Sequence, residues 1–237
     1  MRFDNKASAR DHVWAELENR KLAAYPFPAR GRIPNFRGAR EAAERLFGEP
    51  LAAQAQRIKV NPDSPQRFVR AEALRRGISV YVPTPRLAGG FMLLDPDAIP
   101  QDAIWTASAR SNWDKYASAV ALEDLPAMDL IVTGCVAVTT SGKRAGKGAG
   151  YSDLEFAILR ELGHPPAPVA TSVHDVQVVD DFPIDAHDQP LSLIVTPSRT
   201  IKIAEPLPSP SGIDWEKLPG DALEAMPVLA NLKDLAG

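Results

Sequence analysis

Apolar and polar residues along this chain follow two alternating periods. Val13, Trp14 and Leu17 lie on one face at helical spacing, and Asp4 or Asn5 stands where an N-cap is expected. Helices with this pattern are predicted at residues 6–22, 39–47, 65–77 and 151–162. Short β-branched runs predict strands at residues 57–60, 78–82, 91–94, 130–138, 169–173, 176–179, 191–195 and 200–203. Because strands and helices alternate, we predict an α/β fold: a layered, mostly parallel sheet flanked by helices.

The strand prediction is most specific at Leu130–Val138, which is almost continuously apolar. Such a run is typical of a strand buried on both faces of a parallel sheet. Residues 88–128 are less regular and predict a hairpin around Phe91–Leu94, with irregular segments around two tryptophans. From Ala204 onward the chain is rich in proline. We therefore predict one α/β domain over residues 1–203 and a C-terminal arm over 204–237 that is not a separate domain.

The composition is that of an ordinary globular protein. The chain has 237 residues, one cysteine and a net charge of −3. A single cysteine excludes an intrachain disulfide framework and a CxxC zinc site. No apolar run approaches the roughly 20 residues that cross a bilayer, and the N-terminus does not resemble a signal peptide. We therefore expect a cytoplasmic protein without a membrane partner.

Charge is divided unevenly along the sequence. Residues 1–90 carry a net charge of +8, whereas residues 91–237 carry −11. Two interpretations are open: the halves neutralise each other, or the basic half faces a polyanion while the acidic half holds a metal. The acidic overall charge argues against nucleic acid as the partner of Arg30, Arg32, Arg37 and Arg40.

The segment from Gly142 to Asp153 carries the strongest chemical signal. Four glycines, with Lys143, Arg144 and Lys147, lie between a predicted buried strand and a predicted helix. Glycines let backbone N–H groups approach a ligand, and a helix N-terminus favours an anion. The spacing matches neither a Walker A loop nor GxGxxG. The composition indicates phosphate binding, with a flexible glycine turn as the alternative.

Several motifs make the chain recognisable when taken in order. They are KxxxR at 6–10, RIPNFRGA at 32–39, VNPD at 60–63, VPTPRL at 82–87, GCVAV at 134–138, GKRAGKGAGYSDLE at 142–155, VHDVQVVD at 173–180 and TPSR at 196–199. In this order they resemble the 5-formyltetrahydrofolate cyclo-ligase family, in particular its methenyltetrahydrofolate synthetase domain-containing branch. The resemblance implies a phosphosugar-isomerase/CoA-transferase-like fold.

The resemblance also implies an activity, a ligase reaction that forms a C–N bond. 5-Formyltetrahydrofolate would be cyclised to 5,10-methenyltetrahydrofolate with ATP and Mg²⁺. The formyl oxygen takes the γ-phosphoryl group, N10 attacks the activated carbon, and phosphate leaves. The partner would be a reduced folate or a similar small molecule, and the oligomeric state, monomer or homodimer, stays open.

The same resemblance assigns roles to particular residues. Lys147, Arg144 and Tyr151 would be catalytic, and Asp153 and Asp175 would bind Mg²⁺. The nucleotide would be bound by Lys6, Arg10, Arg144, Gly146, Lys147, Gly148, Gly150, Tyr151 and Ser152.

The chain departs from the family pattern in the first turn after the glycines. Ser152 stands where the family has a second aromatic residue, and Leu154-Glu155 follows Asp153. The phosphate side thus resembles the family more closely than the folate side, where the region of the family's acidic residue is Asn61-Pro62-Asp63-Ser64-Pro65. Two alternatives stay open: a non-catalytic nucleotide- or folate-binding protein, and an RNA-associated protein. The pairs His174-Asp175 and His187-Asp188 suggest a metal or a general base. Without an HxxxH spacing a zinc site is not expected, and the favoured interpretation is that His174 orients Asp175 or lines the pocket while His187 is a loop residue.

Overall fold

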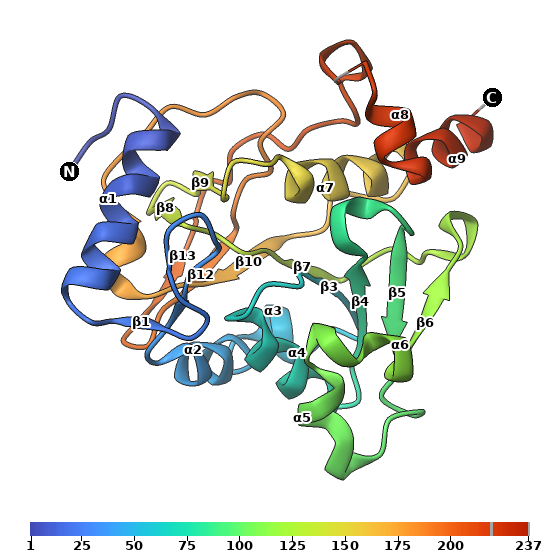
Figure 1. Ribbon diagram of the computed structural model, residues 1–237, viewed down its shortest axis with the longest axis horizontal. Coiled ribbons are helices and arrows are strands. Elements are labelled where there is room, and N and C mark those ends of the chain that lie inside the picture. The colour runs from blue at the N-terminus through green and yellow to red at the C-terminus, as the bar shows by residue number, and fades with distance from the viewer. Residues whose placement is uncertain (219, 237) are drawn as a thin grey trace.

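A parallel sheet forms the centre of the molecule. The computed structural model describes residues 1–218 and 220–236. The main sheet has eight strands in the order β13-β12-β10-β7-β3-β4-β5-β6. Neighbours from β12 to β4 are parallel, whereas β13, β5 and β6 join the edges antiparallel. The prediction of an α/β fold with a mostly parallel sheet is therefore confirmed (Figure 1).

The strands are short. The main sheet contains β3 (Arg57–Val60), β4 (Ser79–Pro83), β5 (Phe91–Leu94), β6 (Ala117–Val120), β7 (Leu130–Val132), β10 (Val169–Ser172), β12 (Leu193–Val195) and β13 (Thr200–Lys202). A three-stranded sheet contains β8 (Ala137–Thr139), β9 (Arg144–Ala145) and β11 (Val178–Val179), and a two-stranded sheet contains β1 (Ala23–Ala24) and β2 (Asn35–Phe36).

The helices among the described residues differ widely in length. They are α1 (Lys6–Asn19), α2 (Ala39–Leu46), α3 (Pro50–Ala53), α4 (Gln66–Arg75), α5 (Ile104–Ala107), α6 (Trp113–Tyr116), α7 (Tyr151–Glu161), α8 (Ala222–Ala225) and α9 (Pro227–Ala236). Four of them confirm predicted helices, at 6–22, 39–47, 65–77 and 151–162. As expected, Asn5 caps α1: its side chain accepts a hydrogen bond from the Ser8 N–H at 2.9 Å. None of the helices described is long and apolar enough to cross a membrane.

Strand alternation sends side chains to two separate cores. In β7, Leu130 and Val132 belong to the core that contains α2 and α4, whereas Ile131 belongs to the core that contains α7 and α9. In β3, Ile58 faces the first of these cores, and the polar side chain of Lys59 reaches Glu155 of α7. The sheet is thus covered on both faces, as the apolar run in β7 indicated.

Two predicted strands require correction. Leu130–Val138 is not one strand: the chain leaves the main sheet after Val132, and β8 pairs with β9 and β11 instead. At Gly134, between them, a Cβ atom would lie 2.8 Å from Asp63 Oδ2, so only glycine allows this close approach. Val176–Val179 starts as the 3-10 helix η5 (Asp175–Gln177), and only Val178–Val179 is extended.

The C-terminal segment contributes to the second core. Ala222, Met226, Val228, Leu229 and Leu232 are buried together with residues of α7. In Figure 1, α8 and α9 lie against the C-terminal half of α7. Residues 204–237 as an arm of the main domain remain a prediction, and Pro219 and Gly237 lie outside the described residues.

Candidate functional site

A cavity of about 760 Å³ opens where β3 and β4 end, and we call it the loop cavity. Asn61 and Asp63 follow β3 and line it, as do Thr84 and Arg86 after β4. Its other wall is the glycine loop with the first turn of α7. Ligands of open parallel sheets bind at this carboxyl edge, and the volume suits a nucleotide-sized molecule.

The glycine loop delivers the first turn of α7 to the cavity. Gly150 caps α7 in the left-handed region (φ 71°), and Tyr151, Ser152 and Asp153 line the cavity. A Cβ at Gly146 would lie 2.9 Å from Arg144 Nη2, which explains a glycine there. Unpaired N–H groups at this helix end favour an anion.

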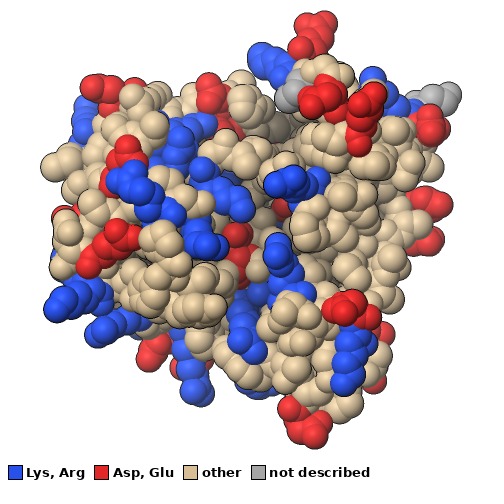
Figure 2. Space-filling view, in the orientation of Figure 1, with Lys and Arg blue, Asp and Glu red and all other residues tan. Residues whose placement is uncertain are grey.

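Cations from distant segments meet at the same cavity. Lys6 and Arg10 of α1 line it together with Arg144 and Lys147. Arg10 Nη1 donates to the Gly146 carbonyl at 3.4 Å, which brings α1 against the loop. Figure 2 shows lysines and arginines around the central hollow of this face. All the predicted nucleotide-binding residues therefore line one cavity, and their roles remain a prediction.

Lys143 behaves differently from the other loop cations. Its ammonium group donates to Asp181 at 2.7 Å and to the Phe182 carbonyl at 3.2 Å. Lys143 does not line the loop cavity. Lys143 therefore anchors the start of the loop, and Lys147, which is exposed, carries its charge toward the cavity.

The structure brings Asp153 to the cavity and does not bring Asp175 there. Asp175 accepts hydrogen bonds from Thr196 Oγ1 at 2.8 Å and Ser198 Oγ at 2.6 Å, and lies 3.5 Å from Arg199 Nε. These contacts join the turn after β10 to the turn after β12. The structure therefore does not bring the expected pair Asp153 and Asp175 to one cavity, and Asp175 instead fastens two turns together.

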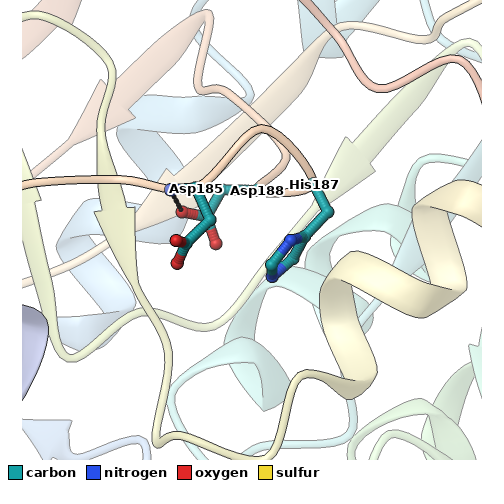
Figure 3. Close-up of side chains that lie close together, drawn as sticks. All are labelled: Asp185, His187 and Asp188. Carbon is teal, nitrogen blue, oxygen red and sulfur yellow. Dashed lines mark hydrogen bonds between the residues drawn. The ribbon is translucent and has the colours of Figure 1, made fainter. Parts of the chain in front are cut away.

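The residue that accompanies Asp153 is Asp188, from the second His-Asp pair. Asp153 Oδ1 accepts from the backbone N–H of Gln189 at 3.0 Å, and both carboxylates line the loop cavity. Ligand atoms of Asp185, His187 and Asp188 lie within 4.8 Å of one another (Figure 3). Lys6 forms ion pairs with Asp185 at 2.9 Å and with Asp188. Sequence reasoning noted both His-Asp pairs, but only the structure distinguishes them.

Arg144 holds Asp153 in place through a buried ion pair. Its guanidinium, 3% exposed, donates to Asp153 Oδ1 at 2.5 Å. Burial lowers the pKa of Arg144, but Asp153, Cys135 and Asp188 together raise it above its ordinary value, so the ion pair is retained. Arg144 Nε is buried without a partner among the described residues.

A second cavity of about 640 Å³ adjoins the first, and we call it the aromatic cavity. Phe68, Trp105 and Tyr25 line it, and Arg67 lies over the Trp105 ring at 3.8 Å from the centroid. The two cavities share Ile33, Pro62, Asp63, Arg110 and Lys147. They form one continuous groove with a nucleotide-sized part and a part with aromatic walls.

Asp63 lies where the two cavities meet. Burial raises the pKa of its carboxyl group above the usual value, although Lys147, Arg70 and Lys59 act in the opposite direction. A half-buried acid at the junction of two cavities is a common feature of active sites.

A buried polar network lies beneath the first turn of α7. Lys59 of β3 forms an ion pair with Glu155 of α7, and both side chains are at most 5% exposed. Asn61 Nδ2 donates to Ser152 Oγ at 3.0 Å and to Glu155 Oε2 at 3.1 Å. The network fastens β3 to the helix turn that carries Tyr151 and Asp153. Sequence reasoning assigned no role to Lys59, whose charge interrupts the apolar pattern of a buried strand.

Fold and site define an α/β protein with a groove lined by lysines and arginines at the carboxyl edge of its sheet. Residues 4–197 match the model of the 5-formyltetrahydrofolate cyclo-ligase family, so the chain belongs to that family. The resemblance found in the motifs is thereby confirmed.

Several relatives carry related names. A mouse "methenyltetrahydrofolate synthase domain-containing protein" is 38% identical over 97% of this chain and 63% of its own length. The human protein of that name is 35% identical over 97% of this chain and 61% of its length. The 5-formyltetrahydrofolate cyclo-ligase of Escherichia coli K12 is 27% identical over 67% of this chain and 87% of its length. The chain thus spans less than two thirds of the longer relatives.

The fold has a counterpart among solved structures. The NMR structure of Aquifex aeolicus 5,10-methenyltetrahydrofolate synthetase covers 90% of this chain and 99% of its own, with a TM-score of 0.51 at 16% identity. This likeness concerns the fold and agrees with the layered arrangement described above.

Proposed function

We propose that this chain cyclises 5-formyltetrahydrofolate to 5,10-methenyltetrahydrofolate with ATP. One observation carries the proposal: at the N-terminus of α7 a single cavity gathers cations and carboxylates, among them Lys6, Arg10, Lys147, Asp153 and Asp188. Phosphoryl transfer requires this combination of cations, metal ligands and backbone donors. Family membership supplies the reaction, and the groove has the two compartments that two substrates need.

The phosphates of ATP would occupy the loop cavity. Lys147, on the exposed loop, is the cation best placed to follow the transferred phosphoryl group. Arg144 orients the Asp153 carboxylate, and Tyr151 presents its ring beside the same turn. Lys6 and Arg10 would bind phosphate oxygens from α1, and Lys6 would exchange its present carboxylate partners for them.

Mg²⁺ would be held by Asp153 and Asp188, whose oxygens suit this cation. The fit rests on the two carboxylates that face one cavity, and Asp188 also belongs to the cluster with Asp185 and His187. Bound Mg²⁺ would neutralise charge on the phosphates. Asp175 is not part of this proposal, since it does not line the loop cavity and its Oδ1 accepts hydrogen bonds from Thr196 and Ser198.

The reduced folate would occupy the aromatic cavity. Phe68 and Trp105 offer apolar walls for its rings. The formyl group would then lie near Lys147 and Asp63, which belong to both cavities. This meeting point supports in-line transfer to the formyl oxygen by proximity.

The test is to follow methenyl product absorbance with purified protein, Mg·ATP and 5-formyltetrahydrofolate. We expect Lys147→Ala to lower turnover roughly a hundredfold or more, the loss typical for a group that stabilises transition-state charge. Lys143→Ala is the matched control on the same loop and should retain turnover, because Lys143 lies outside the groove. ATP binding without product would instead support the non-catalytic alternative.

A further inference from the structure

The chain between β4 and β5 brings one more cation to the loop cavity. Residues Thr84–Gly90 form a tight loop, and Thr84, Pro85 and Arg86 line the cavity. Arg86 is exposed, and the described residues provide no carboxylate within ion-pair distance of it. Its charge is therefore available to a ligand in the cavity.

This loop adopts an unfavourable backbone. Arg86 and Leu87 have φ angles of 55° and 57°, in the left-handed region that residues with a Cβ avoid. Backbone strain of this kind persists only where the surroundings enforce it, and it is concentrated at functional sites. Local hydrogen bonds enforce part of it: Gly89 N–H donates to Thr84 Oγ1 at 2.9 Å, and Leu87 N–H donates to the Thr84 carbonyl at 3.0 Å.

The C-terminal segment also holds this strained loop in place. Leu87 is fully buried in the core that contains Met226, Val228 and Leu229. A Cβ on Gly90 would lie 3.4 Å from Val228 Cγ2, so α9 packs directly on the loop. In Figure 1 the chain that follows β4 lies beneath α7, beside α8 and α9. These helices follow residue 197, where the family match ends.

We propose that α8 and α9 hold the Thr84–Gly90 loop in its strained form, and that Arg86 thereby binds a phosphate group of ATP in the loop cavity. The inference rests on the proposed function for the identity of the anion. The C-terminal arm then positions a loop of the active site. Arg86 is the ligand-binding residue, and Leu229 and Val228 are positioning residues.

The first measurement is the affinity for Mg·ATP by calorimetry. Arg86→Gln should weaken binding about tenfold to a hundredfold, the value of a hydrogen bond to a charged group. Arg86→Lys should recover part of that loss because it restores the charge. Unchanged affinity in Arg86→Gln would overturn the assignment.

The second measurement follows the loop without relying on activity. Trypsin cleaves after Arg86 only when Leu87 leaves the core, so cleavage there reports loop release. Leu229→Ala, and the smaller change Val228→Ala, should speed this cleavage and weaken Mg·ATP binding. Leu235→Ala is the control, since this α9 side chain is 50% exposed. Equal cleavage in all variants would refute the coupling between arm and loop.

The two measurements separate the inference from the proposed function. If the unaltered chain binds no Mg·ATP, the proposed function and the role of Arg86 both fail. Cleavage at Arg86 then still decides whether the arm holds the loop. In the double variant Leu229→Ala/Arg86→Gln, the two losses of affinity should not add, because both act through one side chain.

Discussion

The Lys59–Glu155 pair allows a quantitative test of the structure. Both side chains are almost completely buried, and Asn61 bonds to both: Lys59 Nζ donates to Asn61 Oδ1 at 3.3 Å, and Asn61 Nδ2 donates to Glu155. Glu155→Leu would leave the Lys59 ammonium with Asn61 Oδ1 as its remaining partner. Removing one partner of a buried pair typically costs about 3–5 kcal/mol. Domains have a total unfolding free energy of about 5–15 kcal/mol, so this is a large fraction.

The assay is urea unfolding followed by tryptophan fluorescence, supported by thermal melting. In a chain of this length, 1 kcal/mol corresponds to about 2–4 °C, so Tm should fall by roughly 6–20 °C. The double variant Lys59→Met/Glu155→Leu removes both charges and should lie within about 1 kcal/mol of the unaltered chain, or above it. Glu44→Gln is the control, because the Arg40–Glu44 pair is exposed and such pairs contribute little to stability.

Two results would refute the reasoning. If Glu155→Leu lowers the unfolding free energy by less than about 1 kcal/mol, the pair contributes no more than an exposed ion pair does. A double variant as unstable as the sum of both single variants would show that the charges do not interact. The variants that lack Glu155 should also bind Mg·ATP more weakly, because Asn61 and Glu155 fasten the turn that carries Asp153.

Two further predictions concern carboxylates. Asp188→Asn should weaken Mg²⁺-dependent ATP binding about tenfold or more, as measured by calorimetry with and without Mg²⁺. Asp175→Asn should lower Tm and leave that affinity unchanged. The reverse pattern would restore Asp175 as the ligand. Asp63→Asn should raise Tm at neutral pH, because burial raises the pKa of Asp63 in the folded state. Such a group stabilises the fold at low pH and loses that contribution as pH rises through its folded pKa, so the gain should shrink toward about pH 4. A gain independent of pH would contradict this explanation.

Local signals in the sequence were sufficient for most elements. β3 has the predicted bounds, and Asn5 begins α1 as its side chain chemistry indicated. The strand predicted over 130–138 failed because an apolar run does not say which sheet it joins. The break comes at Gly134, where the loop after β3 brings Asp63 against the backbone. That contact joins segments about 70 residues apart, which no local pattern encodes.

The proposed metal ligands show the same limit. The sequence has two His-Asp pairs, 13 positions apart. Either fits a metal by residue type, so spacing cannot choose between them. The choice depends on tertiary contacts: Thr196 and Ser198 occupy Asp175, whereas the Gln189 backbone bonds Asp153 and draws Asp188 to the cavity.

The departures from the family pattern have a common physical explanation. Ser152 replaces an aromatic residue, and from the sequence this change indicated a loss on the folate side. In the structure Ser152 accepts a hydrogen bond from Asn61, which also bonds Glu155, the second position that departs. Glu155 in turn pairs with Lys59 on β3. A buried acid alone at position 155 would be costly, and so would a buried lysine alone at 59. Ser152, Asn61, Glu155 and Lys59 therefore depend on one another, and together they form a polar clamp on the turn that presents Asp153.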